Sequence, residues 1–343
     1  MGTTSEQRQR AFRELGHEVA GIDTEPPSVR AVERKLLYRV QYRLLRSGIV
    51  PGFHGVPDRA KANQQILERT RSEQYDVLWL DKGLTISAAT LREVKRRQPE
   101  CLIGGYCCDD MMHPANQSRQ FLEHLGMYDA FFTTKTYNVQ ELMALGCRRP
   151  IFMVNTYDPA THRPVGVTAS ERAALGGEVG CIGAWERPRA EVLNVIAKEG
   201  ISVRVWGNGW QKMRHRHERL VIEGRPLWAE SYAKGLCSFD ICLGFLCKAN
   251  RDLQTHRSVE IPACQAFLLA ERTTEHAELF EEGREAEYFG STEELLRKIR
   301  YYLAHPDERK RIAAAGRERC LRSGYSNQEK LKWALAKMLE LED

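Results

Sequence analysis

Three features that assign many proteins to a class at first sight are missing from this sequence. No apolar run approaches the length that spans a bilayer, and the N-terminus, MGTTSEQRQR, lacks the apolar core of a signal peptide. Neither charge dominates, since 51 basic residues are nearly balanced by 46 acidic ones, whereas a nucleic-acid-binding protein normally has a strongly basic face. The ten cysteines include no CxxC pair, which argues against a zinc ribbon or a redox centre. We therefore expect a cytoplasmic protein with reduced cysteines, no transmembrane segment and no nucleic-acid partner.

Several sequence motifs that bind nucleotides or cleave esters are also missing. The absence of GxxxxGK followed by Ser or Thr excludes P-loop nucleotide hydrolysis. The absence of GxSxG excludes hydrolases with a nucleophile elbow. No complete GxGxxG is present, which argues against NAD. We expect neither a metal nor a cofactor, and the mild net charge of +5 suits a cleft that accepts an anionic ligand.

Apolar runs alternate with amphipathic stretches along most of the chain. This alternation is typical of βαβ units, whose right-handed crossovers pack helices on both faces of a parallel sheet. A length of 343 residues is enough for two such α/β domains. The candidate strands are Tyr75–Leu80, Leu102–Tyr106, Asp129–Thr133, Ile151–Val154, Val179–Gly183, Ser202–Trp206, Asp240–Phe245 and Ala266–Ala270. The candidate helices are Ser87–Arg97, Gln117–Leu125, Val139–Leu145, Arg189–Lys198, Thr292–Leu303 and two more after Pro306, the last being Asn327–Leu341.

Two segments interrupt this pattern. Asn155–Glu178 is rich in Pro, Gly and Thr without clear periodicity, so we interpret it as a connection between two domains. The first sixteen residues open directly on a helix, followed by a candidate strand, His17–Ile22. In a doubly wound domain a strand normally precedes that helix. Either the sheet forms without this strand, or the natural chain begins upstream of the present one.

The stretch from Gln254 to Glu271, QTHRSVEIPACQAFLLAE, is the most informative. Arg257 and Glu260 are three residues apart on a short helical segment, which places them on one face. Arginine binds phosphate through a planar fork of donors, and a carboxylate accepts hydrogen bonds from ribose hydroxyls. The pair therefore suits a ligand that carries both groups. The alternative is an ordinary surface salt bridge between neighbours on a helix.

Two glycine turns follow candidate strands. Gly183-Ala184-Trp185-Glu186 leads into a helix that contains Pro188 and Arg189, and such a turn can hold phosphate at the helix N-terminus. Gly207-Asn208-Gly209-Trp210 lies at the end of the next strand, where open α/β sheets bind ligands and where tryptophan can stack on a base. Ordinary β–α turns are the alternative for both.

Acidic and histidine side chains provide the remaining candidates. Asp109 and Asp110 directly follow a strand, where they are either catalytic or metal-binding carboxylates, or caps of the next helix. His113 and His162 are isolated in the sequence, and we interpret both as structural.

With these residues in place, the chain resembles the CgeB-like, spore-maturation-type glycosyltransferases over nearly its whole length. The resemblance rests on VGCIGAWERPRAEVL, ISVRVWGNGW and DLQTHRSVEIPACQAFLLAERTTEHAELFEEGREAEYF in the second half, and on CCDDMMHPANQSRQF and YDAFFTTKTYNVQELMALG in the first. It implies a GT-B fold, in which two Rossmann-like domains face each other across a cleft. The implied domains are residues 1–160 on the acceptor side, 161–326 for the nucleotide sugar, and a helix at 327–343 that returns to the first domain.

The resemblance also implies a role for each candidate residue. Glu260 becomes the carboxylate that binds ribose, and Arg257 and Arg189 become contacts of the diphosphate. The pocket for the nucleotide-sugar donor is then lined by Gly183, Trp185, Gly207, Gly209 and Trp210. The implied activity is a metal-independent, hexosyltransferase-like reaction on an unknown acceptor (a saccharide, a protein or a lipid-linked molecule), with Arg257 stabilising the leaving group. Asp109 and Asp110 are the candidates for a general base that activates the acceptor hydroxyl, and an enzyme that retains the anomeric configuration needs no such base.

The sequence departs from the family pattern at two places. Gln265 replaces the glycine that usually follows the Cys of the Ala-Cys-Gly turn, and the first strand of the N-terminal domain is not evident. Two further functions therefore stay open: a non-catalytic nucleotide-sugar-binding protein, and a GT-B-like sugar-nucleotide epimerase or hydrolase that needs no acceptor.

Overall fold

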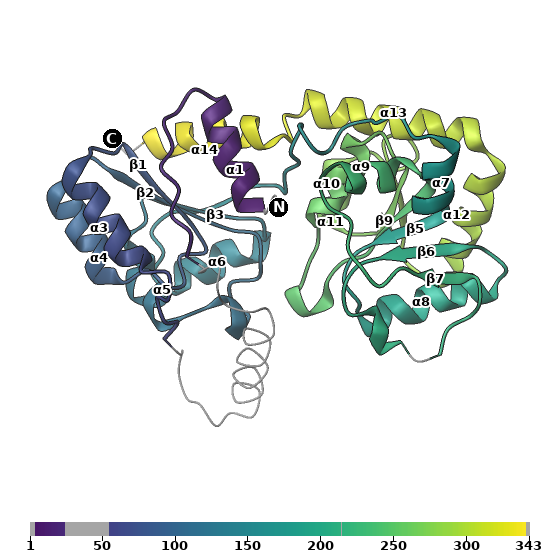
Figure 1. Cartoon of the computed structure of the whole chain (residues 1–343), viewed down its shortest axis with the longest axis horizontal. Helices are drawn as coiled ribbons and strands as arrows, with labels where there is room; N and C mark the ends of the chain where they lie inside the picture. Colours follow the sequence, from purple (N-terminus) through teal and green to yellow (C-terminus); the bar gives the residue numbers. More distant parts are fainter. Residues whose placement is uncertain (1–3, 25–54, 214, 341–343) are drawn as a thin grey trace. The chain divides into compact units, whose positions relative to one another are not determined.

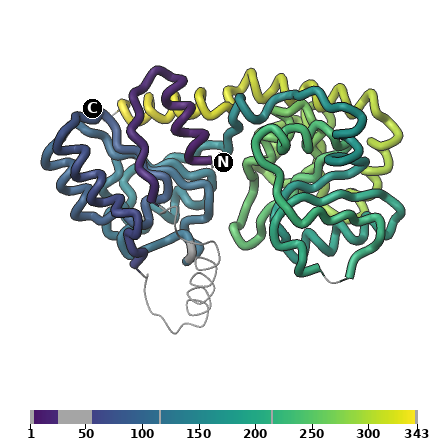
Figure 2. Tube along the Cα trace, viewed as in Figure 1, coloured from purple at the N-terminus to yellow at the C-terminus, as the bar shows by residue number. Residues whose placement is uncertain are grey.

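The computed structural model describes residues 4–24, 55–213 and 215–340. It divides the chain into two compact units, each with its own parallel sheet (Figures 1 and 2). The larger unit contains Met1–Leu15 and Asn155–Leu331, and the smaller unit contains Gly16–Val154 and Lys332–Asp343. The first helix therefore belongs to the same unit as the second half of the chain, whereas the sequence grouped it with the first half.

The larger unit is built on a six-stranded parallel sheet of order β10-β9-β8-β5-β6-β7. The chain moves outward from β5 to β7, returns to the other side of β5, and continues from β8 to β10. The strand order thus reverses between β5 and β8, and open α/β sheets bind ligands beside such a reversal. The strands are β5 (Gly177–Ile182), β6 (Val203–Trp206), β7 (Leu220–Ile222), β8 (Phe239–Gly244), β9 (Leu268–Glu271) and β10 (Glu287–Phe289).

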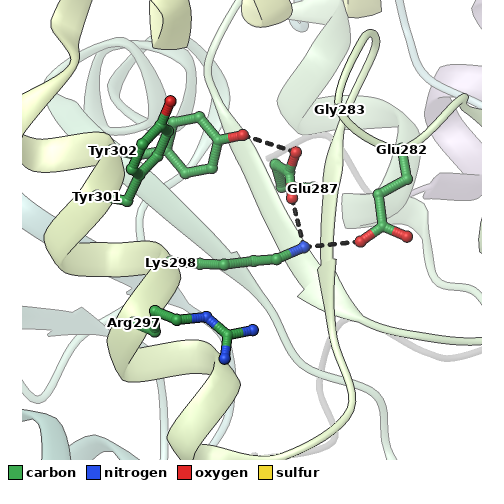
Figure 3. A pocket seen from close by; sticks show the side chains of 7 residues that line it. All are labelled: Glu282, Gly283, Glu287, Arg297, Lys298, Tyr301 and Tyr302. Carbon is green, nitrogen blue, oxygen red and sulfur yellow. Dashed lines mark hydrogen bonds and ion pairs between the residues drawn. The ribbon is translucent and has the colours of Figure 1, made fainter.

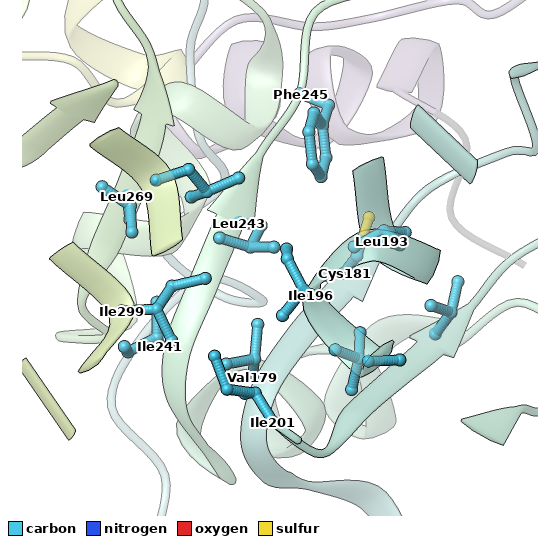
Figure 4. Packing of buried hydrophobic residues seen from close by; sticks show 14 of the residues in the cluster. Val179, Cys181, Leu193, Ile196, Ile201, Ile241, Leu243, Phe245, Leu269 and Ile299 are labelled. Atoms are coloured by element: carbon cyan, nitrogen blue, oxygen red, sulfur yellow. The ribbon is translucent and has the colours of Figure 1, made fainter. Parts of the chain in front are cut away.

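Branched aliphatic side chains form the main core of this unit (Figure 4). Val179, Ile241 and Leu269 come from the central strands, and Leu193 and Ile196 come from a covering helix. Strands covered on both faces must be apolar throughout, which explains their near-continuous hydrophobic sequence. The helices of the unit are α1 (Thr4–Glu14), α7 (Ala169–Leu175), α8 (Arg187–Lys198), α9 (Ala229–Cys237), α10 (His256–Ala263), α11 (Thr274–Leu279), α12 (Thr292–Ala304) and α13 (Pro306–Arg322).

The smaller unit has a four-stranded parallel sheet of order β1-β2-β3-β4, without a reversal. Right-handed crossovers in one direction place their helices on one face, and side chains of α4, α5 and α6 share one core with Ile103 and Phe131. The elements are β1 (Val77–Asp81), β2 (Leu102–Cys107), β3 (Ala130–Thr133), β4 (Pro150–Phe152), α3 (Ala62–Ser72), α4 (Ala88–Arg97), α5 (Arg119–His124) and α6 (Thr136–Ala144).

The end of α14 (Asn327–Leu339) covers the other face of this sheet. Trp333 packs edge-on against Phe132, with ring centroids 5.9 Å apart. Gly104 lies beneath Met338, and a Cβ at this glycine would come within 2.8 Å of the methionine Sδ. The glycine therefore allows the helix to approach the sheet closely.

All eight strands predicted from apolar runs are present, within about two residues at most boundaries. One predicted strand was wrong. His17–Ile22 has no regular secondary structure, so the first strand in the described part of the chain is β1. The segment Asn155–Glu178, interpreted as a connection between domains, starts at the boundary of the two units and contains α7 and the start of β5. None of the helices in the described ranges has the length and apolar character needed to cross a membrane.

Candidate functional site

The loops after β5 and β6 meet at the carboxyl end of the larger sheet. Gly207 has a φ of 150°, and a Cβ there would lie 2.0 Å from the carbonyl oxygen of Gly183. Only glycine allows this approach. Gly209, at a φ of 84°, starts the short 3-10 helix Trp210–Lys212. These glycines fix the course of both predicted turns.

Trp210 forms a hydrogen bond with the Gly183 turn. Its indole Nε1 donates a 2.9 Å hydrogen bond to the Gly183 carbonyl, and the side chain is only 1% exposed within the core. The predicted aromatic wall for a base is therefore wrong for Trp210, whose ring is enclosed by protein.

Two arginines, which the resemblance implies as diphosphate contacts, approach the Gly183 turn. A Cβ at Gly183 would lie 2.9 Å from Nη1 of Arg189 and 3.8 Å from the guanidinium carbon of Arg257. Arg189 is 5% exposed and donates to the carbonyl of Ala184, so it closes the turn. Arg257 is partly exposed and forms no hydrogen bond or ion pair with any described residue. Its guanidinium donors are thus available to a ligand.

Glu260 lies one helical turn beyond Arg257 on α10, and the two form no ion pair in the described structure. The surface salt bridge considered from the sequence is therefore wrong. Instead, the hydroxyl of Tyr232 donates a 2.6 Å hydrogen bond to Oε2 of Glu260. Nε2 of His162 lies 3.6 Å from Oε1.

The charge state of Glu260 reflects opposing effects. Burial favours the neutral acid, but His162, His256, the Tyr232 hydrogen bond and Arg257 together favour the carboxylate. The pKa of Glu260 is consequently lower than its usual value of 4.5. An ionised acceptor with a 12% exposed side chain therefore lies one helical turn from a cation that has no hydrogen-bond or ion-pair partner among the described residues.

The turn after β5 also contains two buried N–H groups without acceptors. Nε1 of Trp185 and Nε of Arg189 have no hydrogen-bond partner among the described residues. Most buried donors in proteins are satisfied, so these two N–H groups are free to bond a ligand or a water molecule. The ammonium of Lys212 lies over the Trp185 ring, 4.8 Å from its centroid.

A pocket of about 220 Å³ adjoins this turn at the carboxyl ends of β8, β9 and β10. Arg189 lies on its wall, with its guanidinium carbon 5.8 Å from the centroid of Phe245. Two charged side chains of the wall, Lys248 and Glu271, pair with each other. The pocket therefore lies next to the Gly183 turn, on the side toward the edge strand β10.

A second pocket, of about 320 Å³, lies between β10 and α12 (Figure 3). Lys298 bonds at 2.7 Å to Glu282, at 2.5 Å to Glu287 and at 2.7 Å to the carbonyl of Tyr288. The hydroxyl of Tyr302 donates to Glu287 at 2.7 Å. Because these groups satisfy one another, this cluster ties the edge strand to its helix.

The two aspartates after β2 have different surroundings. Asp110 is 3% exposed, and its Oδ1 accepts 3.0 Å hydrogen bonds from the Asn138 side chain and from the backbone N–H of Met112. This arrangement is that of a buried turn cap, which the sequence had offered as the alternative to catalysis. Asp109 is about one third exposed and pairs with Lys82, which follows β1. Of the two, only Asp109 is accessible.

Sequence reasoning missed two residues that contact Glu260. Tyr232 lies 28 residues before it on α9, and His162 lies in the connecting segment and had been interpreted as structural. No periodicity or spacing links either to Glu260, because the contacts are tertiary. Within the described ranges, no three His, Cys, Asp or Glu side chains gather as a metal site.

Comparison with known proteins agrees with this geometry. Residues 187–336 match the family model described as glycosyl transferase-like. This region is less than half of the chain and contains Arg189, Arg257 and Glu260. No curated protein matches the sequence.

Several solved structures share the fold across both units. HepE from Anabaena, solved with UDP and glucose, has 12% identity and a TM-score of 0.58, covering 92% of this chain and 98% of that one. Sucrose-phosphate synthase from Thermosynechococcus elongatus has 12% identity and a TM-score of 0.61, covering 98% and 92%. A glycosyltransferase from Rickettsia africae has 10% identity and a TM-score of 0.56, covering 98% and 94%. The chain has the GT-B fold, with two Rossmann-like domains.

Proposed function

We propose that the protein is a glycosyltransferase that uses a nucleoside diphosphate sugar as donor. The observation that carries this proposal is the convergence of Arg189 and Arg257 at the Gly183 turn, beside the reversal of strand order in the larger sheet. A diphosphate there would meet the free guanidinium of Arg257 and the positive N-terminus of α8. The match of residues 187–336 to a glycosyl transferase-like family supports the same assignment.

The neighbouring groups fit the rest of a nucleotide sugar. Glu260 is ionised and can accept hydrogen bonds from ribose hydroxyls. The unsatisfied N–H groups of Trp185 and Arg189 can donate to oxygens of the donor. Arg257 has the further role of stabilising the negative charge that develops on the leaving diphosphate, so the reaction needs no metal ion.

For the acceptor we propose Asp109 as the general base. It follows a strand of the smaller sheet, is partly exposed, and is paired with Lys82. Asp110 is excluded from this role because its carboxylate is buried and bonded to two donors. A base within hydrogen-bond reach of a hydroxyl can remove its proton as the bond to the sugar forms.

UDP-glucose is the first donor to test, because a structure of HepE contains it. The test is calorimetric titration of the purified protein with UDP, UDP-glucose and the corresponding guanosine and adenosine compounds, followed by assays for release of the nucleoside diphosphate. We expect binding of one nucleotide sugar and release that depends on an added acceptor. No binding to any of these compounds would refute the proposal. Release in water alone would identify a hydrolase, and binding without release under any condition a non-catalytic protein.

A further inference from the structure

The Glu260 carboxylate is held by side chains from two segments that are distant in the sequence. Tyr232 reaches it from α9, and His162 reaches it from the segment that precedes α7. The His162 and Tyr232 rings also contact each other edge to face, with centroids 5.5 Å apart. One carboxylate is therefore contacted on both oxygens by two mutually packed side chains.

Tyr232 acts on Glu260 as a fixed donor. Burial and the neighbouring carboxylate raise the pKa of Tyr232 well above its usual value of 10, so the hydroxyl keeps its proton. That proton is directed at Oε2 over 2.6 Å, a short hydrogen bond to an ionised acceptor. The remaining lone pairs of both carboxylate oxygens stay available, since an ionised carboxylate has about four acceptor sites.

A hydrogen bond from the backbone sets the orientation of the His162 ring beside Glu260. The N–H of Asp158 donates to Nδ1 of His162 at 2.9 Å, so Nδ1 accepts and Nε2 is the ring nitrogen that can donate. Nε2 is the nitrogen that lies 3.6 Å from Oε1 of Glu260. Asp158 is itself fixed, because its carboxylate accepts from Thr161 and pairs with Arg10 of α1.

We propose that Tyr232 and His162 are positioning residues, which hold the Glu260 carboxylate in the plane that binds the ribose hydroxyls of the donor. The inference rests on the proposed function, because it requires a nucleotide at this site. Two adjacent hydroxyls are recognised together only by a carboxylate whose plane is fixed. If the Glu260 side chain rotated freely, the site would lose its preference for ligands with both ribose hydroxyls. Its affinity for the diphosphate, which we propose that Arg257 contacts, would be retained.

The readout that isolates this role is the ratio of the dissociation constants of 2′,3′-dideoxy-UDP and UDP, measured by calorimetry. In the wild type the ratio should be well above one. In Tyr232→Phe it should move toward one, with UDP bound about tenfold more weakly and dideoxy-UDP little changed. A residue that only stabilised the fold would weaken both ligands equally and leave the ratio unchanged.

Two substitutions of His162 separate the roles of Nδ1, which accepts from the Asp158 N–H, and Nε2, which faces Glu260. His162→Asn places an acceptor near Nδ1 for the Asp158 N–H but has no donor that reaches Glu260. His162→Gln places a donor near Nε2. We expect the first to lower the ratio, by about threefold, and the second to retain most of it.

Tyr302→Phe is the matched control, because it removes a similar tyrosine–glutamate hydrogen bond, of 2.7 Å, in the cluster of Figure 3. This substitution should lower thermal stability about as much as Tyr232→Phe does, and it should leave the ratio of the two dissociation constants unaltered. A wild-type ratio that persists in Tyr232→Phe and in His162→Asn would overturn the positioning role alone. A wild type that binds no nucleotide would overturn the proposed function and this inference with it.

Discussion

In both units carboxylates lie near the carboxyl edge of a parallel sheet, but the groups that surround these carboxylates differ. In the smaller unit Asp110 is buried with two donors and Asp109 is paired with Lys82. In the larger unit Glu260 keeps its charge beside Arg257, a cation with no protein partner among the described residues. Asp110, which is buried and bonded to two donors, has the surroundings of a structural carboxylate, whereas an ionised carboxylate beside a cation without a partner in the described ranges is typical of a binding site.

The same contrast separates the two arginines of the larger unit. Arg189 is buried and donates to the carbonyl of Ala184, so part of its hydrogen-bonding capacity is used within the turn. The guanidinium carbon of Arg257 lies 3.8 Å from a Cβ placed on Gly183, and Arg257 has no acceptor among the described residues. We therefore propose that Arg257 makes the main diphosphate contact, while Arg189 maintains the turn and keeps its unbonded Nε for the ligand.

Arg257→Ala should have the largest effect on donor binding and turnover. It removes the free guanidinium, so we expect a loss of about 100-fold in UDP-glucose turnover, or roughly 3 kcal/mol. Affinity for uridine, which has no phosphate, should change little. Arg300→Ala, which removes an exposed arginine paired with Glu199, is the control. Equal losses for UDP and uridine would assign Arg257 to the fold and not to the diphosphate.

Asp109→Asn tests whether the smaller unit contributes to the reaction. Because Asp109 is the proposed general base, this substitution, which removes its charge, should lower turnover by about 100-fold. UDP affinity should stay at the wild-type value, because the proposed donor site is in the other unit. Its ion pair with Lys82 is partly exposed, so stability should change by less than about 1 kcal/mol. Wild-type turnover in this variant would remove Asp109 from the mechanism.

Asp110→Ala should affect stability and not chemistry. The change leaves the Asn138 side chain and the Met112 N–H without their buried acceptor, which costs on the order of 3 kcal/mol. Urea unfolding of the smaller unit measures this cost. UDP affinity at low temperature, where the variant is folded, should match the wild type, and a selective loss of turnover would contradict the structural role.

Glu260→Gln should reveal the charge of Glu260 through the pH dependence of stability. The pKa of Glu260 in the folded protein is lower than 4.5, so folding favours the ionised form. Its contribution is present above pH 4.5 and is lost as the pH falls through the folded-state pKa. The difference in unfolding free energy between wild type and variant should thus be constant from pH 7 to about 5 and change only at lower pH. A change centred near neutral pH would contradict this assignment.

Gln265→Gly should have the smallest effect. Gln265 follows α10 with a φ of 56°, a left-handed conformation that costs a non-glycine residue about 1 kcal/mol. Glycine should therefore raise the unfolding free energy by up to about 1 kcal/mol, measured by urea denaturation. UDP affinity should be unaffected, because Gln265 already adopts the backbone conformation that glycine would provide.

The extent to which the sequence predicted the fold depended on burial. Central strands such as β5 and β8 are apolar on both faces and were found from composition alone. The edge strands β7 and β10, of three residues each, were not predicted, although β4, which is equally short, was. Helix α7 buries no residue and so lacks an apolar stripe, although its capping box, Thr168 with Glu171, was a usable signal.

The candidate site was predictable only where it lies on one element. Arg257 and Glu260 are one turn apart on α10, so helical spacing alone brought them together. The contacts of Glu260 with Tyr232 and His162 depend on how α9 and the connecting segment pack, which spacing does not encode. Trp210 was misassigned for the same reason, since its burial follows from packing beneath the Gly183 turn.

Hydrogen exchange of the wild-type protein with and without UDP tests the central claim most directly, because it reads both sheet edges in one measurement. If the larger unit holds the nucleotide, UDP should slow exchange in the segments 183–189 and 255–261 and leave 105–116 unchanged. Slowed exchange confined to 105–116, with none at the Gly183 turn or at the start of α10, would contradict the account.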